Sequence, residues 1–311
     1  MKHYTSIQDI SELDSLVKDA FSLKRNPRAF ETLGKGKTLV MLFFNASLRT
    51  RLSTENAAKN LGMDVQILNV TDSWKLEFAD GSIMNADTSE HVREAAQVIA
   101  QYADVLAVRA FPSLTDKQAD QQEMVLKSFI KYAGIPVVNM ESATQHPLQA
   151  LADLITIEEN KTIKQPKVVL SWAPHPKALP HAVANSFIQI MQRAEVDLSI
   201  THPEGYGLDP NIVQGTPVIY DQEKALEQAD FVYVKNWSSF ENYGKVLSQD
   251  PSWMMTTDKL NHARFMHCLP VRRNVVVEDA VLDSDQSLVI QQAGNRTFSA
   301  QVVLKNILEK L

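Results

Sequence analysis

The chain has 311 residues, of which 44% are hydrophobic and 22% charged, and its net charge is -6. This length suffices for two domains, and the negative charge argues against nucleic acid or an anionic membrane as the main partner. The longest strongly apolar run, residues 38–44, is too short to cross a bilayer, and the polar N-terminus shows no signal segment. A single cysteine excludes a disulfide framework and a cysteine-based zinc site. We therefore expect a cytoplasmic protein without a metal or another cofactor.

Short β-branched runs alternate with helical stretches along almost the whole chain. This alternation predicts βαβ units and an α/β fold built on parallel sheets. The expected helices include the amphipathic stretches at residues 51–61, 91–102 and 148–160. The expected strands are residues 38–44, 65–70, 105–109, 136–140, 167–172, 196–200, 231–235, 264–267 and 288–290.

A polar, proline-containing stretch at residues 161–167 lies near the middle of the chain. It follows the expected helix 148–160, so we place the domain boundary around residues 150–165, with that helix as the bridge. Open parallel sheets bind ligands at the carboxyl ends of their strands. Side chains that could bind a ligand follow most of the expected strands: Ser47, Arg49 and Thr50, then Arg109, Glu141, His175, Lys235, His267 and Cys268.

The first candidate site follows the first expected strand, where Ser47 is expected to cap a helix. The N–H groups of the first helical turn have no helical partners, and the helix dipole favours an anion there. With Arg49 and the hydroxyls of Ser47 and Thr50, this helix start could bind a phosphate. The alternative is an ordinary capped helix in which Arg51 and Glu55 form an i,i+4 ion pair.

The second candidate site is the segment His146-Pro147-Leu148-Gln149. Proline favours the first helical position, so His146 would cap the helix and Gln149 would stand at its third position. Both side chains would project at the helix start, where His146 could stabilise a carbonyl oxygen that gains charge. The alternative is that His146 only caps a helix that begins at Pro147.

The third candidate site is the segment His267-Cys268-Leu269-Pro270, where a strand runs into a proline-containing loop. A nucleophilic Cys-His pair is one interpretation, but sequence neighbours on a strand point to opposite faces. A packed cysteine fits the pattern better. The carbonyl groups of this loop, which Pro270 turns outward, are better suited to hold an amine.

Together these three segments resemble the aspartate/ornithine carbamoyltransferase family. That family has S-T-R-T-R before a helix, H-P-x-Q at the start of its bridging helix, and H-C-L-P in its ornithine branch. This chain has Ser47-Leu48-Arg49-Thr50-Arg51 and the two other motifs in the same order and at similar spacing, so the resemblance covers essentially the whole chain. It implies two doubly wound parallel-sheet domains joined by a bridging helix, and a homotrimer with shared active sites.

In this family pattern, residues 1–147 would bind carbamoyl phosphate and residues 148–294 the amino substrate, while the C-terminal helix 295–311 would pack back on the first domain. Leu48 in place of threonine, the segment Asp72-Ser73-Trp74 and Arg272 after the third motif are similar to the N-acylornithine carbamoyltransferases of arginine biosynthesis. Plain ornithine carbamoyltransferase is the alternative. Its Ser-Met-Gly loop is absent here, where the chain has Val234-Lys235-Asn236-Trp237 after a strand. Lys235 suits an acylated substrate with its carboxylates.

The resemblance implies a role for each matching position. Trp74 would be supplied by a neighbouring subunit, and Arg49, Thr50, Arg109, His146 and Gln149 would be catalytic. The residues that would bind carbamoyl phosphate are Ser47, Leu48, Arg49, Thr50, Trp74, Arg109, His146, Gln149, Cys268, Leu269 and Arg296. Those that would bind the acylornithine are Glu141, His175, Lys235, Arg272 and Ser89.

One loop position, directly before Glu90, distinguishes the acyl groups in the resembling enzymes: glutamate accompanies acetyl and proline accompanies succinyl. This chain has Ser89, which would not repel a succinyl carboxylate, and Arg272 could pair with that carboxylate. N-succinylornithine is therefore preferred over N-acetylornithine as the partner of carbamoyl phosphate. Two other classes are a binding protein that has lost transfer, and a dehydrogenase; the chain has no GxGxxG for the latter.

Overall fold

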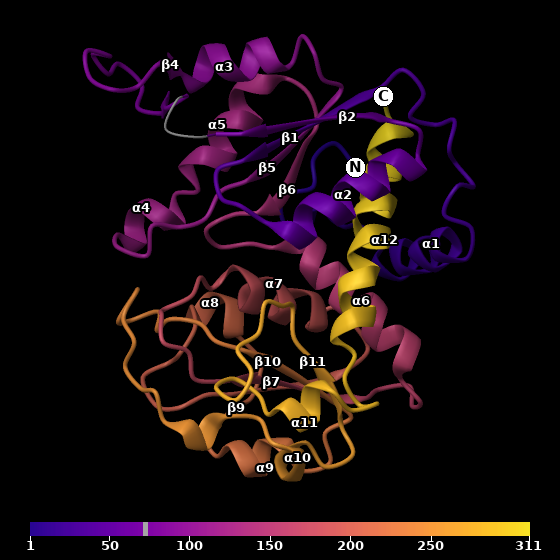
Figure 1. Cartoon of the computed structure of the whole chain (residues 1–311), viewed down its shortest axis with the longest axis vertical. Coiled ribbons are helices and arrows are strands. Elements are labelled where there is room, and N and C mark those ends of the chain that lie inside the picture. Colours follow the sequence, from indigo (N-terminus) through magenta and orange to yellow (C-terminus); the bar gives the residue numbers. More distant parts are fainter. Residues whose placement is uncertain (71–73) are drawn as a thin grey trace. The chain divides into compact units, whose positions relative to one another are not determined.

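A computed structural model describes residues 1–70 and 74–311 of the chain. The chain forms two compact units (Figure 1). Unit 1 comprises Met1–Ser113, Gln118–Leu148 and Arg296–Leu311, and unit 2 comprises Leu114–Lys117 and Gln149–Asn295. Among the described residues, no helix is long and apolar enough to span a membrane.

Unit 1 contains a four-stranded parallel sheet. Its strands lie in the order β2-β1-β5-β6 and all of them are parallel. Their bounds are β1 (Thr38–Phe43), β2 (Asp64–Asn69), β5 (Val105–Arg109) and β6 (Val137–Glu141). The chain adds β2 on one side of β1 and then β5 and β6 on the other side, so the order reverses between β1 and β5. Ligands of open α/β sheets bind at the carboxyl ends of the strands beside such a reversal.

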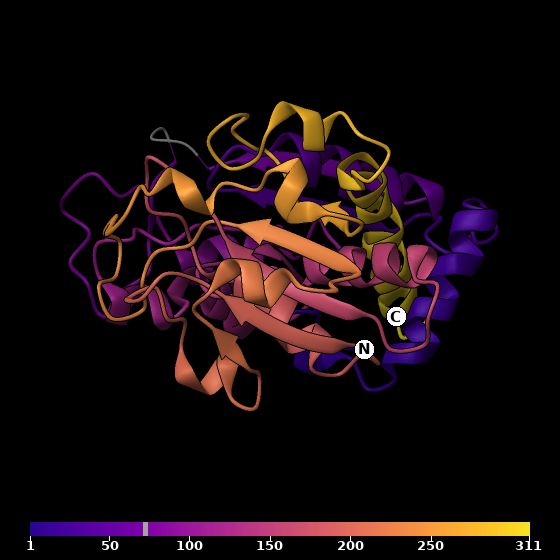
Figure 2. The same ribbon diagram turned by 90° about the horizontal axis from the view of Figure 1, so that it is seen from below.

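Unit 2 contains a five-stranded parallel sheet, and some of its strands stand out as broad arrows in Figure 2. The order is β11-β10-β7-β8-β9, and it reverses between β7 and β10. The bounds are β7 (Lys167–Trp172), β8 (Asp197–Thr201), β9 (Val218–Ile219), β10 (Phe231–Lys235) and β11 (Arg264–Met266). A separate two-stranded sheet in unit 1 pairs β3 (Leu76–Glu77) with β4 (Glu90–His91).

Helices complete both units. Five strands are buried along nearly their whole length, namely β1, β5, β6, β7 and β10. Strands buried on both faces read as continuous apolar runs. The helices of unit 1 are η1 (Ile7–Asp9), α1 (Leu13–Arg25), α2 (Leu48–Asn60), α3 (Val92–Ile99) and α5 (Met124–Ala133). Those of unit 2 are α7 (Ala182–Met191), α8 (Pro210–Val213), α9 (Gln222–Leu226), η2 (Pro251–Trp253), α10 (Thr257–Leu260) and α11 (Asp279–Leu282). Residues of both units occur in α4 (Lys117–Gln121), α6 (Pro147–Asn160) and α12 (Val289–Leu308).

The predicted α/β fold with parallel sheets is confirmed, but the expected strand at residues 288–290 is wrong. Ser287 forms a single parallel bridge with Phe265 of β11, and the chain then enters α12 at Val289. A run of three apolar residues shows no periodicity that separates a strand from the first turn of a buried helix. The short strands β3, β4 and β9 were not expected, because two residues cannot show an alternating pattern.

Candidate active site

The start of α2 has the predicted cap. Ser47 has an extended backbone, with φ -155° and ψ 120°, and its hydroxyl oxygen accepts a hydrogen bond from the N–H of Thr50 at 3.3 Å. Leu48 is 67% exposed, so its side chain takes no part in the core. The helix ends in a Schellman motif, in which the N–H groups of Gly62 and Met63 donate to Lys59 and Ala58. Gly62 has φ +80°, which favours glycine at this turn.

The side chain of Thr50 is the centre of a buried cluster at the carboxyl end of the unit 1 sheet. Its hydroxyl oxygen accepts hydrogen bonds from Arg109 Nη1 at 3.0 Å and from Arg296 Nη2 at 2.6 Å. Arg109 is 6% exposed and Arg296 is 5% exposed. Because both acceptor positions of the oxygen are used, the hydroxyl hydrogen points elsewhere and can donate to a ligand oxygen.

A carboxylate completes this cluster. Glu141 Oε2 lies 2.5 Å from Arg109 Nη1 and 3.3 Å from His146 Nε2. The ends of β5 and β6 explain the first contact, since Arg109 and Glu141 are register partners across a bulge. We call these five residues, Thr50, Arg109, Glu141, His146 and Arg296, the Thr50 cluster. Glu141, which the sequence assigned to the acylornithine, is here engaged by two residues assigned to carbamoyl phosphate.

Trp74 and Ser89 lie at the small β3–β4 sheet of unit 1. The indole N–H of Trp74 donates to Glu90 at 2.9 Å, and the N–H of Ser89 donates to the Lys75 carbonyl at 2.8 Å. Trp74 is half-buried and Ser89 is exposed. The β3–β4 sheet therefore places Trp74 and Lys75 beside Ser89 and Glu90, while Asp72 and Ser73 lie outside the described residues.

Three basic residues come together at the carboxyl ends of β7 and β10 in unit 2. Arg272 Nε donates to His175 Nε2 at 3.1 Å, and His175 Nδ1 lies 2.9 Å from the Lys177 carbonyl. Burial lowers the pKa of His175 below its usual 6.5, and the charges of Lys235 and Arg272 lower it further. The imidazole is therefore neutral at pH 7, with Nε2 as the acceptor. We call His175, Lys235 and Arg272 the His175 cluster.

The His267-Cys268-Leu269-Pro270 loop also belongs to unit 2. The N–H of Leu269 donates to His267 Nδ1 at 2.9 Å, and Leu269 has φ +53°, an uncommon conformation for leucine. Cys268 is a buried, free thiol. The imidazole of His267 is thus used to hold the loop backbone, and the geometry favours a packed cysteine over a Cys-His nucleophile.

The sequence analysis missed the buried residue that binds Gln149. Helix α6 begins at Pro147, as predicted, and Gln149 Nε2 donates to the fully buried carboxylate of Asp153 at 2.7 Å. The signal was present, because Asp153 interrupts the apolar stretch 150–155 and stands four residues after Gln149, which is the spacing of a facing pair.

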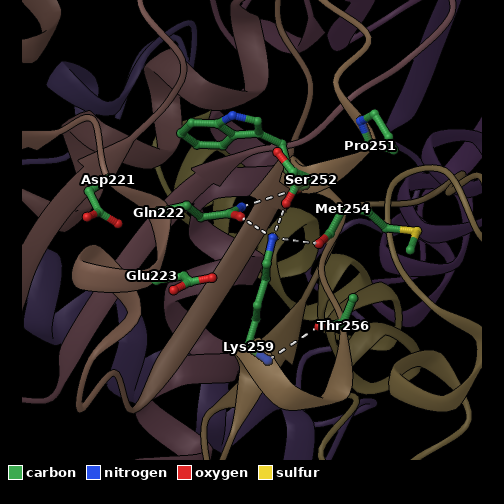
Figure 3. Close-up of a pocket in the computed structure, with 9 residues that line it drawn as sticks. Asp221, Gln222, Glu223, Pro251, Ser252, Met254, Thr256 and Lys259 are labelled. Atoms are coloured by element: carbon green, nitrogen blue, oxygen red, sulfur yellow. Dashed lines mark hydrogen bonds between the residues drawn. The ribbon is translucent and has the colours of Figure 1, made fainter.

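A pocket of about 390 Å³ lies elsewhere in unit 2, and none of the predicted site residues lines it (Figure 3). The ammonium group of Lys259 lies in this pocket and donates to Gln222 Oε1 at 2.7 Å and to the carbonyls of Ser252 and Met254. These bonds hold α9, η2 and α10 together, which is a structural role. The lining residues are Asp221, Gln222, Glu223, Pro251, Ser252, Trp253, Met254, Thr256 and Lys259.

Comparison with known families gives two consecutive matches. Residues 2–159 match the carbamoyl-P binding domain of aspartate/ornithine carbamoyltransferases, and residues 180–307 match their Asp/Orn binding domain. The N-succinylornithine carbamoyltransferase of Bacteroides thetaiotaomicron is 51% identical over 100% of both chains. The N-acetylornithine carbamoyltransferase of Xanthomonas axonopodis pv. citri is 38% identical, over 98% of this chain and 96% of that relative.

Solved structures are similar over nearly the whole chain. Acetylornithine transcarbamylase complexed with acetylcitrulline has a TM-score of 0.92 and 36% identity, and the match covers 99% of each chain. A mutant of N-acetyl-L-ornithine transcarbamylase in which serine replaces one glutamate was solved with carbamyl phosphate and N-succinyl-L-norvaline. It has a TM-score of 0.92 and 37% identity, over 99% of this chain and 100% of that one.

Proposed function

The chain belongs to the aspartate/ornithine carbamoyltransferase family, and from that premise we propose that it carbamoylates the side-chain amine of N-succinyl-L-ornithine. The donor is carbamoyl phosphate, and the products are N-succinylcitrulline and phosphate, a step of arginine biosynthesis. The observation that carries this proposal is the Thr50 cluster, in which two buried guanidinium groups meet one hydroxyl at the start of a helix.

The start of α2 suits the phosphate group of the donor. Its first N–H groups and the helix dipole favour an anion, and Ser47 and Arg49 stand beside them. Arg109 and Arg296 add two fixed positive charges, whereas Glu141 supplies one negative charge. Within this cluster the named charges favour a bound dianion, and burial keeps the electrostatic interaction strong.

The reaction needs a neutral amine, a stabilised oxyanion and a leaving phosphate. We assign the carbamoyl oxygen to Thr50, Arg109 and His146, where preorganised donors would meet the charge that develops. The amine nitrogen forms a bond to the carbamoyl carbon, the bond from that carbon to the phosphate oxygen breaks, and the departing phosphate takes the proton of the amine. The carbonyls of Cys268 and Leu269 orient the amine.

The acylornithine is assigned to the His175 cluster, together with Glu141 and Ser89. The positive charges of Lys235 and Arg272 suit the carboxylates of the substrate. Glu141 would offer an acceptor to the amine from within the Thr50 cluster. The remaining assignments to carbamoyl phosphate, Leu48, Trp74, Gln149 and the Cys268-Leu269 loop, stand as part of the same proposal.

Two observations favour the succinyl group over the acetyl group. The similar N-succinylornithine enzyme shares 51% identity with this chain, against 38% for the N-acetylornithine enzyme. In the related acetylornithine enzyme, a variant with serine in place of one glutamate was solved with N-succinyl-L-norvaline. We assign Ser89 to that place, where a serine would leave room for the succinyl carboxylate and would not repel it.

The test is turnover of N-succinyl-, N-acetyl- and free ornithine with carbamoyl phosphate, measured side by side as citrulline formation. We expect N-succinylornithine to give the highest kcat/KM. Faster turnover of N-acetylornithine would support the second candidate, which the 38% identical relative favours. Release of phosphate that needs no amino substrate, or no turnover at all, would contradict the transfer reaction.

We also propose that the chain works as a homotrimer in which a neighbouring subunit supplies Trp74. Helix α2 exposes Leu48 and Leu52, and the edge strand β2 beside it exposes Leu68. Adjacent exposed leucines of this kind favour association with another protein surface. Light scattering should give a mass of three times 34.9 kDa, and a monomer would contradict the shared site.

A further inference from the structure

Asp153 is a fully buried carboxylate in the middle of α6, within unit 2. A buried charge costs free energy unless strong hydrogen bonds compensate it. One of its oxygens, Oδ1, accepts hydrogen bonds from Gln149 Nε2 and from Gln292 Nε2, both at 2.7 Å. Gln149 is one turn before it in α6, and Gln292 is in the first turn of α12.

Gln292 links Asp153 to the His267-Cys268-Leu269-Pro270 loop. Its Oε1 accepts the N–H of His267 at 3.0 Å, and it is fully buried. A backbone N–H can only donate, and an ionised carboxylate can only accept. The carboxamide of Gln292 is therefore fixed from both ends, with its oxygen toward His267 and its nitrogen toward Asp153.

The same rule fixes Gln149. Because Asp153 Oδ1 can only accept, it selects Nε2 of Gln149 as its neighbour, and the carboxamide cannot turn over without placing two acceptors against each other. One carboxylate oxygen thus fixes the orientation of two carboxamides, because each turns its Nε2 toward Asp153. One of them belongs to the His146-Pro147-Leu148-Gln149 motif, and the other leads to the third motif.

The buried Tyr233 feels the charge of the Asp153 carboxylate. Burial, followed by the Asp153 carboxylate and the Cys268 thiol, raises the pKa of Tyr233 well above its usual 10.0. The hydroxyl therefore stays protonated and lies close to both groups. The printed hydrogen bonds that link Asp153 to the His267-Cys268-Leu269-Pro270 loop run through Gln292.

We propose that Asp153 is a positioning residue for carbamoyl transfer, which holds the Gln149 carboxamide in the one orientation that serves carbamoyl phosphate. The inference rests on the proposed function, since it takes Gln149 to contact that substrate. Asp153 itself does not touch the reacting atoms. It acts through Gln149 and, by way of Gln292, through the backbone at His267.

The first test replaces the carboxylate by an amide of the same size. In Asp153→Asn the side chain can present either oxygen or nitrogen to Gln149, so the direction is no longer imposed. We expect kcat/KM for carbamoyl phosphate to fall about tenfold, the effect of one lost hydrogen bond to a charged group, while KM for the acylornithine changes less than about twofold. Wild-type kinetic constants in Asp153→Asn would overturn the proposal.

The chain offers a matched control at Glu159, six residues further along α6. Its carboxylate also accepts from two carboxamides of α12, Gln291 at 2.9 Å and Asn295 at 2.8 Å, and it stands roughly 15 Å along the helix from Gln149. Glu159→Gln should therefore lower the melting temperature without changing kcat/KM. An equal loss of kcat/KM in Glu159→Gln would overturn the proposal, because weaker packing of α12 on α6 would then explain both variants.

The decisive variant exchanges donor and acceptor. In Asp153→Asn with Gln292→Glu, the carboxylate introduced at position 292 accepts from the His267 N–H and from the amide nitrogen introduced at position 153, so the buried bonds and the net charge are restored. The second hydrogen of that amide nitrogen then selects Oε1 of Gln149, whose carboxamide must turn over. We expect the melting temperature to recover, but kcat/KM for carbamoyl phosphate to stay at least about fivefold low.

Recovery of both quantities in the double variant would show that Asp153 serves stability alone. If Asp153→Asn does not fold, the double variant carries the test by itself. Wild-type protein is assayed in parallel, and a wild-type chain that transfers no carbamoyl group contradicts the proposed function. An active wild-type enzyme with unaffected Asp153 variants contradicts only the role of Asp153.

Discussion

The two units hold their clusters of basic side chains in different ways. In unit 1, Arg109 and Arg296 are buried and share the Thr50 hydroxyl. In unit 2, Lys235 is half-buried and Arg272 is exposed, and they surround a neutral His175. Buried charges interact strongly and are fixed in place, whereas exposed charges are screened by water and salt. On the proposed function, the reacting group would therefore meet fixed charges in unit 1, and the acyl group would meet mobile ones in unit 2.

The largest effect is expected where this contrast is greatest, at Arg109. On the proposed function, Arg109→Met removes a buried donor from the carbamoyl oxygen, and it takes from Glu141 the guanidinium that it pairs with. We expect kcat to fall by about 10² to 10³-fold and the free energy of unfolding to fall by about 3–5 kcal/mol. Citrulline formation and urea denaturation measure the two quantities. A variant with unchanged stability would show that the Thr50 cluster is not the rigid site described above.

Arg49 and Arg51 provide a matched pair on one helix. Arg49 is half-buried at the first turn of α2, and Arg51 is exposed two residues later. Arg49→Ala should lower kcat/KM by about 10²-fold, because it removes a charge-assisted bond to phosphate. Arg51→Ala should remain within about twofold of the wild type, since an exposed charge contributes little. Equal losses in the two variants would indicate a general effect of charge on the helix rather than a phosphate contact.

In unit 2 the expected effect is smaller and falls on the other substrate. Arg272→Ala should raise KM for N-succinylornithine about tenfold, as for one hydrogen bond to a charged group, and leave KM for carbamoyl phosphate unchanged. N-acetylornithine, which lacks the succinyl carboxylate, serves as the control substrate. An equal rise in KM for both acylornithines would place Arg272 elsewhere on the substrate.

Cys268→Ala separates the two interpretations of the third motif. The thiol is buried and His267 is used to hold the N–H of Leu269, so the loop should keep its backbone carbonyls in place. We expect kcat to remain within about threefold of the wild type, because only a small packed group is lost. A folded but inactive variant would restore the Cys-His nucleophile as the better interpretation.

The sequence predicted the α/β fold and the Ser47 cap because these depend on local patterns. A continuous apolar run gave β1, and a serine before a polar helix gave the start of α2. The site was predictable only as a set of candidates at strand ends. Which of them meet depends on contacts far apart in the chain, such as Arg296 with Thr50, 246 residues away. The engagement of Glu141 by Arg109 and His146 leaves no local signal for the same reason.

The smallest expected effect is on stability against pH, and both units contribute to it, since burial lowers the pKa of His3 in unit 1 as well. Three histidines of unit 2 have lowered pKa values, namely His175, His181 and His202, and burial is the main cause in each. Below the usual pKa of 6.5, these imidazoles bind protons in the unfolded chain. In the folded chain they stay neutral until the pH reaches their lower pKa values. The free energy of unfolding should therefore fall as the pH falls through 6.5 toward the folded pKa values.

His202 tests this slope most directly, because it is 4% exposed and its Nδ1 lies 2.8 Å from the Pro203 carbonyl. One proton contributes at most about 1.4 kcal/mol per pH unit. His202→Gln should flatten the decline between pH 6.5 and 5.5 in urea denaturation by up to that amount. Asp250 titrates below this window, because the Ser252 N–H lowers the pKa of its carboxylate below the usual 3.8. An unchanged slope in His202→Gln would mean that His202 takes up its proton as readily in the folded chain as in the unfolded one.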